Sequence, residues 1–186
     1  MVTTRTPNRA PKSRAAAVAS PAIHYRVEAA NLQPHLFGIE LTIAAPEAQQ
    51  TLRLPVWIPG SYLVREFAKN LQNLSCLQGK KALAAQQTDK ATWVVDCAPG
   101  QPLVVRYEVY AFDNSVRTAW LDATRGFFNG TSLCLQVEGQ QDQPHALELV
   151  ATDSIAQWSV ATGATAQKVN KQGFGTYLSQ DYDTLV

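Results

Sequence analysis

The sequence predicts an all-β fold, an antiparallel β-sandwich with long loops and at most one short helix. Apolar and polar residues alternate over several short runs, which is typical of strands that bury one face. Turn-forming glycine, proline and asparagine separate these runs at short intervals. Only one stretch has apolar residues at helical spacing. With 186 residues, the chain is long enough to bury one substantial core.

The first two strands are predicted over residues 23–29 and 37–43. In the first, Ile23, Tyr25 and Val27 alternate with polar or charged side chains, and the second repeats this pattern. A period of two with one apolar face indicates half-buried strands.

The next three strands are shorter. Residues 52–56 form one of them, which Pro55 restricts to a sheet edge or a strand end. Residues 74–77 and 81–83 flank the dipeptide at 78–79, which ends in glycine, so they are predicted to form a hairpin.

The later strands include the longest one. A strand over residues 93–97 ends at the Pro-Gly dipeptide 99–100, and residues 103–111 alternate strictly. Leu63, Phe67 and Leu71 recur every four residues, which predicts a helical turn or two within residues 61–71. The remaining predicted strands are 133–137, 147–149, 158–161 and 174–178.

The first 21 residues differ from the rest of the chain. They contain three prolines, four basic residues and no acidic one, without apolar periodicity, so we expect a disordered basic tail followed by one β domain over residues 22–186. The remaining 12 basic and 15 acidic residues give the domain a mildly acidic balance, which argues against nucleic acid as its partner.

The sequence predicts neither a membrane span nor a working signal peptide. No apolar run reaches the roughly 18 residues of a membrane span, so we expect none. Residues 15–20 resemble the end of a signal peptide, but the apolar stretch that should precede them is missing. We therefore expect a cytoplasmic location, with a periplasmic one as the alternative.

The sequence offers no self-contained active site. His24, His35 and His145 are not spaced as zinc ligands, and no nucleophile motif or phosphate-binding loop occurs. The three cysteines, Cys76, Cys97 and Cys134, include no C-x-x-C pair. Buried free thiols are the favoured interpretation, and a single Cys76–Cys97 bridge is the alternative.

Two stretches are rich in residues suited to recognition. Residues 57–62 (WIPGSY) place two aromatic side chains around a Pro-Gly turn, which predicts a tight loop that presents them to a ligand or a neighbouring domain. Residues 111–122 form a long connection with aromatic and acidic side chains and Arg117, which leads to the aromatic pair at 127–128.

These stretches also carry a resemblance to a known family. Residues 54–71 (LPVWIPGSYLVREFAKNL) resemble the hallmark segment of the glycyl aminopeptidases, zinc metallopeptidases of the gluzincin type that often carry a PDZ domain near the C-terminus. Residues 107–135, 158–162 and 174–186 are similar to later blocks of that family's N-terminal region, in the same order.

The resemblance implies an N-terminal β domain without its thermolysin-like catalytic domain. The family's H-E-x-x-H motif and its downstream glutamate ligand have no counterpart, since the chain has no His-Glu dipeptide. We therefore expect no catalytic residue and no cofactor in this chain, with zinc belonging to the catalytic domain of the parent enzyme. That domain and the N-terminus of a peptide substrate are the expected partners.

The resemblance also suggests which residues contact the substrate. The two stretches would line the end of the cleft that receives the substrate amino group, and a carboxylate there would pair with the ammonium. Glu66 is a further candidate for that carboxylate, and Trp57 or Tyr62 would limit the side-chain pocket to glycine and alanine. The candidate substrate-binding residues are Trp57, Gly60, Tyr62, Asp113, Arg117 and Asp122.

The alternative function is a non-catalytic module that binds carbohydrate or protein. Aromatic side chains gathered in one plane on an exposed face would favour stacking against sugar rings, whereas aromatics divided between core and loops would not. The residues that decide between these arrangements are Trp57, Tyr62, Trp93, Trp120 and Trp158.

Overall fold

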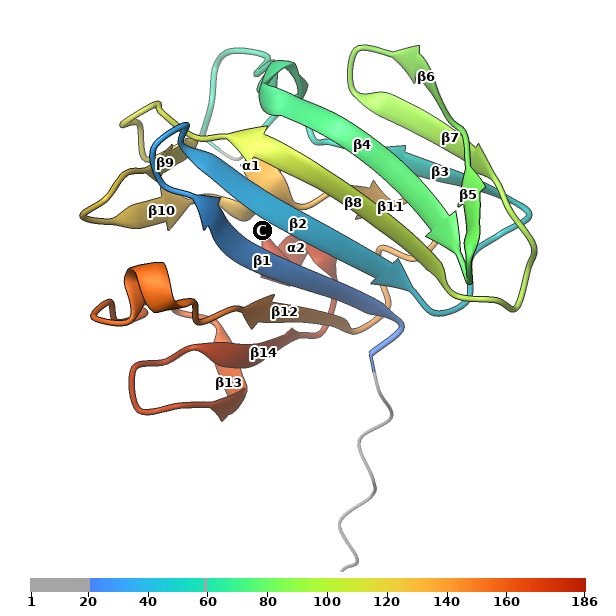
Figure 1. Ribbon diagram of the computed structural model, residues 1–186. Helices are drawn as coiled ribbons and strands as arrows, with labels where there is room; N and C mark the ends of the chain where they lie inside the picture. The colour runs from blue at the N-terminus through green and yellow to red at the C-terminus, as the bar shows by residue number, and fades with distance from the viewer. Residues whose placement is uncertain (1–20, 59) are drawn as a thin grey trace, which may run out of the picture.

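The computed structural model describes residues 21–58 and 60–186. The predicted tail over residues 1–21 lies outside the described residues except for Pro21. Within the described part, two sheets face each other and enclose one core, which confirms the predicted all-β sandwich (Figure 1).

The larger sheet has eight strands. All of its neighbouring pairs are antiparallel except β1 and β12, which run parallel. In spatial order the strands are β13 (Thr165–Val169), β14 (Gly175–Ser179), β12 (His145–Leu149), β1 (Ile23–Asn31), β2 (Leu36–Ile43), β8 (Leu103–Tyr110), β4 (Leu71–Gln78) and β5 (Lys81–Leu83).

The second sheet has four strands and covers part of the first. Its order is β11 (Gln136–Val137), β3 (Gln49–Arg53), β7 (Thr92–Asp96) and β6 (Ala85–Asp89), all antiparallel. A separate hairpin consists of β9 (Ala119–Leu121) and β10 (Gly126–Phe128).

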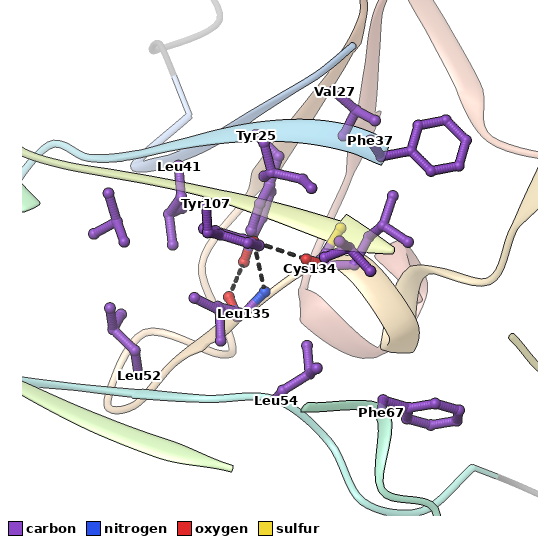
Figure 2. Close-up of a cluster of buried hydrophobic side chains, with 14 of the residues drawn as sticks. Tyr25, Val27, Phe37, Leu41, Leu52, Leu54, Phe67, Tyr107, Cys134 and Leu135 are labelled. Atoms are coloured by element: carbon purple, nitrogen blue, oxygen red, sulfur yellow. Dashed lines mark hydrogen bonds between the residues drawn. The ribbon is translucent and has the colours of Figure 1, made fainter. Parts of the chain in front are cut away.

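The alternation in the sequence determines which side chains enter the core. Tyr25 of β1, Leu41 of β2 and Val105 of β8 lie opposite one another in register and are fully buried. Leu52 of β3 is buried on the opposite side of the core (Figure 2), and Val95 of the neighbouring strand β7 is fully buried as well. The continuous apolar layer between the sheets is the main source of stability, because its area is removed from water.

Three buried tyrosines bind an irregular segment that crosses this core. The hydroxyls of Tyr107, Tyr182 and Tyr25 donate to the carbonyls of Leu133, Cys134 and Leu135, at 2.7, 2.6 and 2.6 Å respectively. The amide of Leu135 also donates to the Tyr107 hydroxyl at 3.2 Å. Figure 2 shows part of this arrangement. Buried backbone groups outside a sheet need such partners, so the tyrosines take the place of a neighbouring strand.

Several predicted elements differ from the structure. The strand predicted at 52–56 ends at Arg53. The Leu54 amide still bonds to the Ala91 carbonyl in the β3–β7 register, but Pro55 has no amide to continue the ladder. In the strand predicted at 133–137, Leu133 belongs to a helical turn, α1 (Gly130–Leu133), and only β11 is a strand. Asn129 caps α1 by accepting the amide of Thr131.

The strand predicted at 158–161 is irregular. The Trp158 amide closes a turn onto Ile155 at the end of η2 (Asp153–Ile155), and Val160 bonds to the carbonyl of Gln172. The helical stretch expected at 61–71 is a single turn, η1 (Phe67–Asn70). With α2 (Tyr182–Leu185) the described residues form four short helical turns, where at most one was predicted.

The cysteines match the favoured interpretation. All three are free, with Cys76 and Cys134 buried and Cys97 half-buried, so the alternative Cys76–Cys97 bridge is not formed. Burial raises the pKa of Cys76 to about 11 and that of Cys134 to about 12, which makes both thiols poor nucleophiles at neutral pH.

Candidate functional site

Residues 54–58 and 60–66, which we call the Trp57 loop, are held by hydrogen bonds among themselves. Gly60 adopts a φ of 79°, in a turn closed by the Ser61 amide and the Ile58 carbonyl at 3.1 Å. The Trp57 Nε1 donates to the Ser61 carbonyl at 2.8 Å, and the buried Ser61 hydroxyl accepts from Arg65 Nε at 3.1 Å. These bonds support the sequence prediction of a well-defined loop at Gly60.

The same loop turns large apolar side chains toward solvent. Trp57 is 53% exposed and Tyr62 is fully exposed, and Val56, Leu63 and Val64 are exposed as well. A loop that is ordered internally but exposes this much apolar surface is typical of an interaction site.

In the structure the second stretch runs from Tyr110, at the end of β8, to Phe128, beyond the connection predicted at 111–122. Three of its side chains form a stack with His35 of the turn between β1 and β2. The His35 ring lies 3.9 Å from the Phe112 ring, centroid to centroid, and the Phe112 ring lies 4.3 Å from that of Trp120. The Arg125 guanidinium covers the Trp120 ring at 5.7 Å. Stacking of this kind holds the connection rigid although Phe112 is exposed.

The three candidate carboxylates differ in what they already bind. Asp122 accepts hydrogen bonds from the Trp120 indole and from the amides and hydroxyl of Thr124 and Arg125, and these bonds hold its pKa well below the usual range. Glu66 forms an exposed ion pair with Lys90 at 2.7 Å, which lowers the Glu66 pKa. The Asp113 carboxylate has no hydrogen-bond partner among the described residues.

The two stretches lie against the same helical turn. The Trp57 loop continues into η1, which contacts α1. In the second stretch, the Thr118 carbonyl accepts from the Asn129 amide and from the Ser132 hydroxyl of α1. Arg117, next to Thr118, is exposed. The η1 turn at the end of the Trp57 loop and the second stretch therefore meet α1 at one end of the sandwich (Figure 1).

The exposed apolar residues are concentrated in these stretches. In the described part of the chain, ten large apolar side chains are exposed, and all but Val169 lie in one stretch or the other. The sequence analysis used Leu63 only as part of a helical pattern and did not name Val64 or Val116, although apolar residues in predicted loops are a signal that could have found them. The second stretch contributes Tyr110, Phe112, Val116 and Phe127 to this exposed surface.

A separate cavity of about 360 Å³ lies beside the hairpin β9–β10. None of the predicted site residues lines it, and its lining includes no charged side chain. Trp158, Phe128, Leu149 and Phe174 form part of its wall, together with the end of α2. Trp158 is half-buried because it packs against the core beside this cavity, although its segment belongs to no sheet.

The described residues do not form a metal site. No group of three or more histidine, cysteine, aspartate or glutamate side chains comes together in residues 21–58 and 60–186. Zinc therefore does not fit this part of the chain. Nor does any helix in the same ranges have the length and apolar character needed to cross a membrane.

Comparison with known proteins identifies the family. The family model described as the Peptidase M61 N-terminal domain matches residues 24–186. This chain belongs to the Peptidase M61 N-terminal domain family. The M61 domain is also 42% identical to an aminopeptidase N family protein from Idiomarina loihiensis, with a TM-score of 0.85 over 88% of this chain.

The match with the Idiomarina protein covers 28% of that protein's chain, so the M61 domain spans under a third of its length. Two other solved structures are more distant. An M1 zinc metallopeptidase from Deinococcus radiodurans has 11% identity and a TM-score of 0.41, over 86% of this chain and 37% of its own. Legionella pneumophila aminopeptidase A has 9% identity and a TM-score of 0.46, over 87% and 19%. No curated protein matches the chain significantly.

The aromatic residues that were to decide the alternative function are divided between environments. Trp57 and Tyr62 are exposed on the Trp57 loop, Trp93 is buried on β7, Trp120 lies inside the stack and Trp158 lines the cavity. This arrangement provides no flat aromatic platform for a sugar ring.

Proposed function

We propose that this M61 domain forms one wall of the substrate cleft in a zinc aminopeptidase that removes N-terminal glycine or alanine. The observation that carries the proposal is the concentration of exposed apolar side chains in two ordered stretches around α1. Exposing large apolar side chains to water is unfavourable, and a neighbouring domain that covers them removes this unfavourable exposure. Zinc and its ligands would belong to that neighbouring catalytic domain.

Within this cleft, Asp113 is the carboxylate best suited to bind the substrate ammonium. Asp122 already accepts several hydrogen bonds, and Glu66 is paired with Lys90. Asp113 is exposed and directly follows the stacked Phe112 in the second stretch. The fully exposed Tyr62, supported by the turn at Gly60, would limit the space for the first side chain of the peptide.

Association of separate domains tests the docking part of the proposal. The remainder of the Idiomarina protein, produced without its own M61 domain, is titrated with this chain in a calorimeter. We expect binding that Trp57→Ala weakens at least about tenfold, as loss of a central aromatic contact does. Val169→Ala, which shortens an exposed apolar side chain outside both stretches, is the matched control and should bind normally. Equal effects of the two substitutions would contradict the proposal.

Steady-state kinetics of the associated domains test the substrate part. We expect Asp113→Asn to raise KM for glycyl and alanyl anilides, with a smaller change in kcat, because the ammonium loses its partner. Glu66→Gln is the control, since its carboxylate pairs with Lys90. An unchanged KM in Asp113→Asn would exclude Asp113 as the ammonium partner without affecting the docking result.

A further inference from the structure

His145 is a buried histidine that the proposed cleft does not use. It opens β12, its side chain is fully buried, and its ring lies between two tyrosines from different parts of the fold. The Tyr25 ring of β1 stacks on it with centroids 6.1 Å apart, and the Tyr182 ring of α2 meets it edge-on at 5.9 Å. The imidazole therefore joins the body of the sandwich to the C-terminal elements.

The hydrogen bonds of the ring define its protonation state. Nδ1 lies 2.6 Å from the Gln143 carbonyl, and a carbonyl only accepts, so Nδ1 carries a proton. Nε2 is buried and has no hydrogen-bond partner among the described residues. The neutral ring fits this site, because a second proton on Nε2 would place a charged donor in the core without an acceptor.

The titratable groups around His145 do not fully neutralise the positive charge of a protonated ring. Burial raises the pKa of Tyr25, Tyr182 and the nearby Cys134, so these groups are neutral in mildly acidic solution. Asp181 at the start of α2 is the charged group that faces His145, but its carboxylate caps the Thr184 amide at 2.7 Å. Burial dominates over Asp181, and the pKa of His145 lies below its ordinary value.

The C-terminal elements β12, β14, β13 and α2 are attached to the rest of the sandwich through few connections. β12 is attached to the body by the parallel pairing with β1, and β14 and β13 extend outward from β12 (Figure 1). α2 is attached through the Tyr182 amide to Gln141 and through the Tyr182 hydroxyl to Cys134. Leu185 and Val186 at the end of α2 also close one side of the apolar cavity.

We propose that His145 is a pH-sensitive latch, whose neutral ring holds α2 against the sandwich and whose protonation releases α2 and opens the cavity. The direction of the pH effect follows from how readily the ring binds a proton in the latched and in the released state. The released ring takes up a proton near pH 6.5, whereas the latched ring resists it, so the latched state loses stability as the pH falls below about 6.5. The loss is at most tenfold in the latching equilibrium for each pH unit below about 6.5, and it ends where the latched ring itself takes up a proton.

Amide hydrogen exchange of the full chain tests the latch. After correction for intrinsic rates, we expect exchange in α2 to be faster at pH 5.5 than at pH 7.5, by at most about tenfold, while β2 and β8 keep their protection. Trp158, which lines the cavity, should shift its fluorescence emission to longer wavelength over the same range. Uniform loss of protection across the fold, or equal protection of α2 at both pH values, would overturn the proposal.

Variants separate His145 from the other histidines. His145→Phe keeps the stacking surface without a titrating group, so exchange in α2 should become independent of pH. His145→Asn, which retains a donor for the Gln143 carbonyl, is a second variant with the same expectation. His24→Asn, at a half-exposed site beside Glu148, is the control and should leave the pH dependence intact. If both His145 variants keep the wild-type pH dependence, the latch is disproved. In the wild type, an NMR titration that puts the His145 midpoint at or above about 6.5 would disprove it as well.

Discussion

At the scale of single residues, the tyrosine hydroxyls explain how a non-sheet segment can cross the core. Three consecutive carbonyls, from Leu133 to Leu135, each accept a hydrogen bond from a tyrosine that belongs to a different element. A buried carbonyl without a partner is costly, so each hydroxyl has a larger effect on folding than its small size suggests. The same segment leads directly from α1, which supports both exposed stretches.

Removing these hydroxyls should have unequal effects. Tyr107→Phe leaves the Leu133 carbonyl and the Leu135 amide unpaired and should lower the free energy of unfolding by about 2–4 kcal/mol. Tyr25→Phe leaves only the Leu135 carbonyl unpaired and should cost about 1–2 kcal/mol. Urea unfolding of both variants measures the difference, and equal losses would show that the Leu135 amide finds another partner.

Trp93 and Trp57 allow the stability contribution of a core tryptophan to be compared with that of an exposed one. Trp93 is 6% exposed and packs in the core, whereas Trp57 is 53% exposed on its loop. Trp93→Ala should destabilise the isolated chain by about 3–5 kcal/mol. Trp57→Ala removes one hydrogen bond to Ser61 and should cost about 1 kcal/mol. Thermal unfolding of each variant measures this, and a Trp57 loss as large as the Trp93 loss would make Trp57 a core residue.

At the scale of elements, burial decides which strands the sequence could predict. β1, β2 and β8 have one buried face, so their apolar residues alternate and the strands are visible in the sequence. Nearly every side chain of β6 and all those of β13 are exposed, so neither strand has such a pattern, and only the backbone pairing defines them. Leu133 was assigned to a strand because it alternates with Leu135 and Val137, but the Asn129 cap favours the helical turn.

The hairpin of β13 and β14 depends on a glycine. Gly175 has a φ of 136°, and a Cβ built there would lie 2.2 Å from the Lys168 carbonyl oxygen. Gly175→Ala should therefore separate β13 from β14 and cost at least about 2 kcal/mol. Gly163→Ala, where nothing lies within 4 Å of the new Cβ, is the control and should be neutral. Hydrogen exchange of β13 reports the separation, and protected β13 amides in Gly175→Ala would contradict it.

At the scale of the whole molecule, the candidate site was predictable in outline but not in its chemistry. The aromatic content of both stretches predicted a candidate site, and in the structure η1, at the end of the Trp57 loop, and the second stretch both meet α1. Which carboxylate remains available was only partly predictable. Asp122 binds amides two and three residues further along the chain, a local turn that aspartate favours, whereas Glu66 meets Lys90 from a distant strand connection that exists only in the folded chain.

The positions of the three histidines in the fold determine whether they can bind a zinc ion together. A catalytic zinc ion needs three protein ligands that converge, and the three histidines of this chain lie on separate elements with other partners. His24 pairs with Glu148 at 3.6 Å, His35 stacks on Phe112, and His145 is bound to the Gln143 carbonyl inside the core. Bringing them together would require the sandwich to unfold.

We therefore expect the purified 186-residue chain to hydrolyse neither glycyl nor alanyl anilides, with or without added zinc. Activity should arise only in the presence of the catalytic part of a family member, because the ligands and the metal-activated water would come from that part. The measurement combines anilide hydrolysis with elemental analysis of the dialysed protein. Stoichiometric zinc together with chelator-sensitive hydrolysis by this chain alone would show that residues outside the described ranges complete a metal site, and would contradict the assignment of catalysis to another domain.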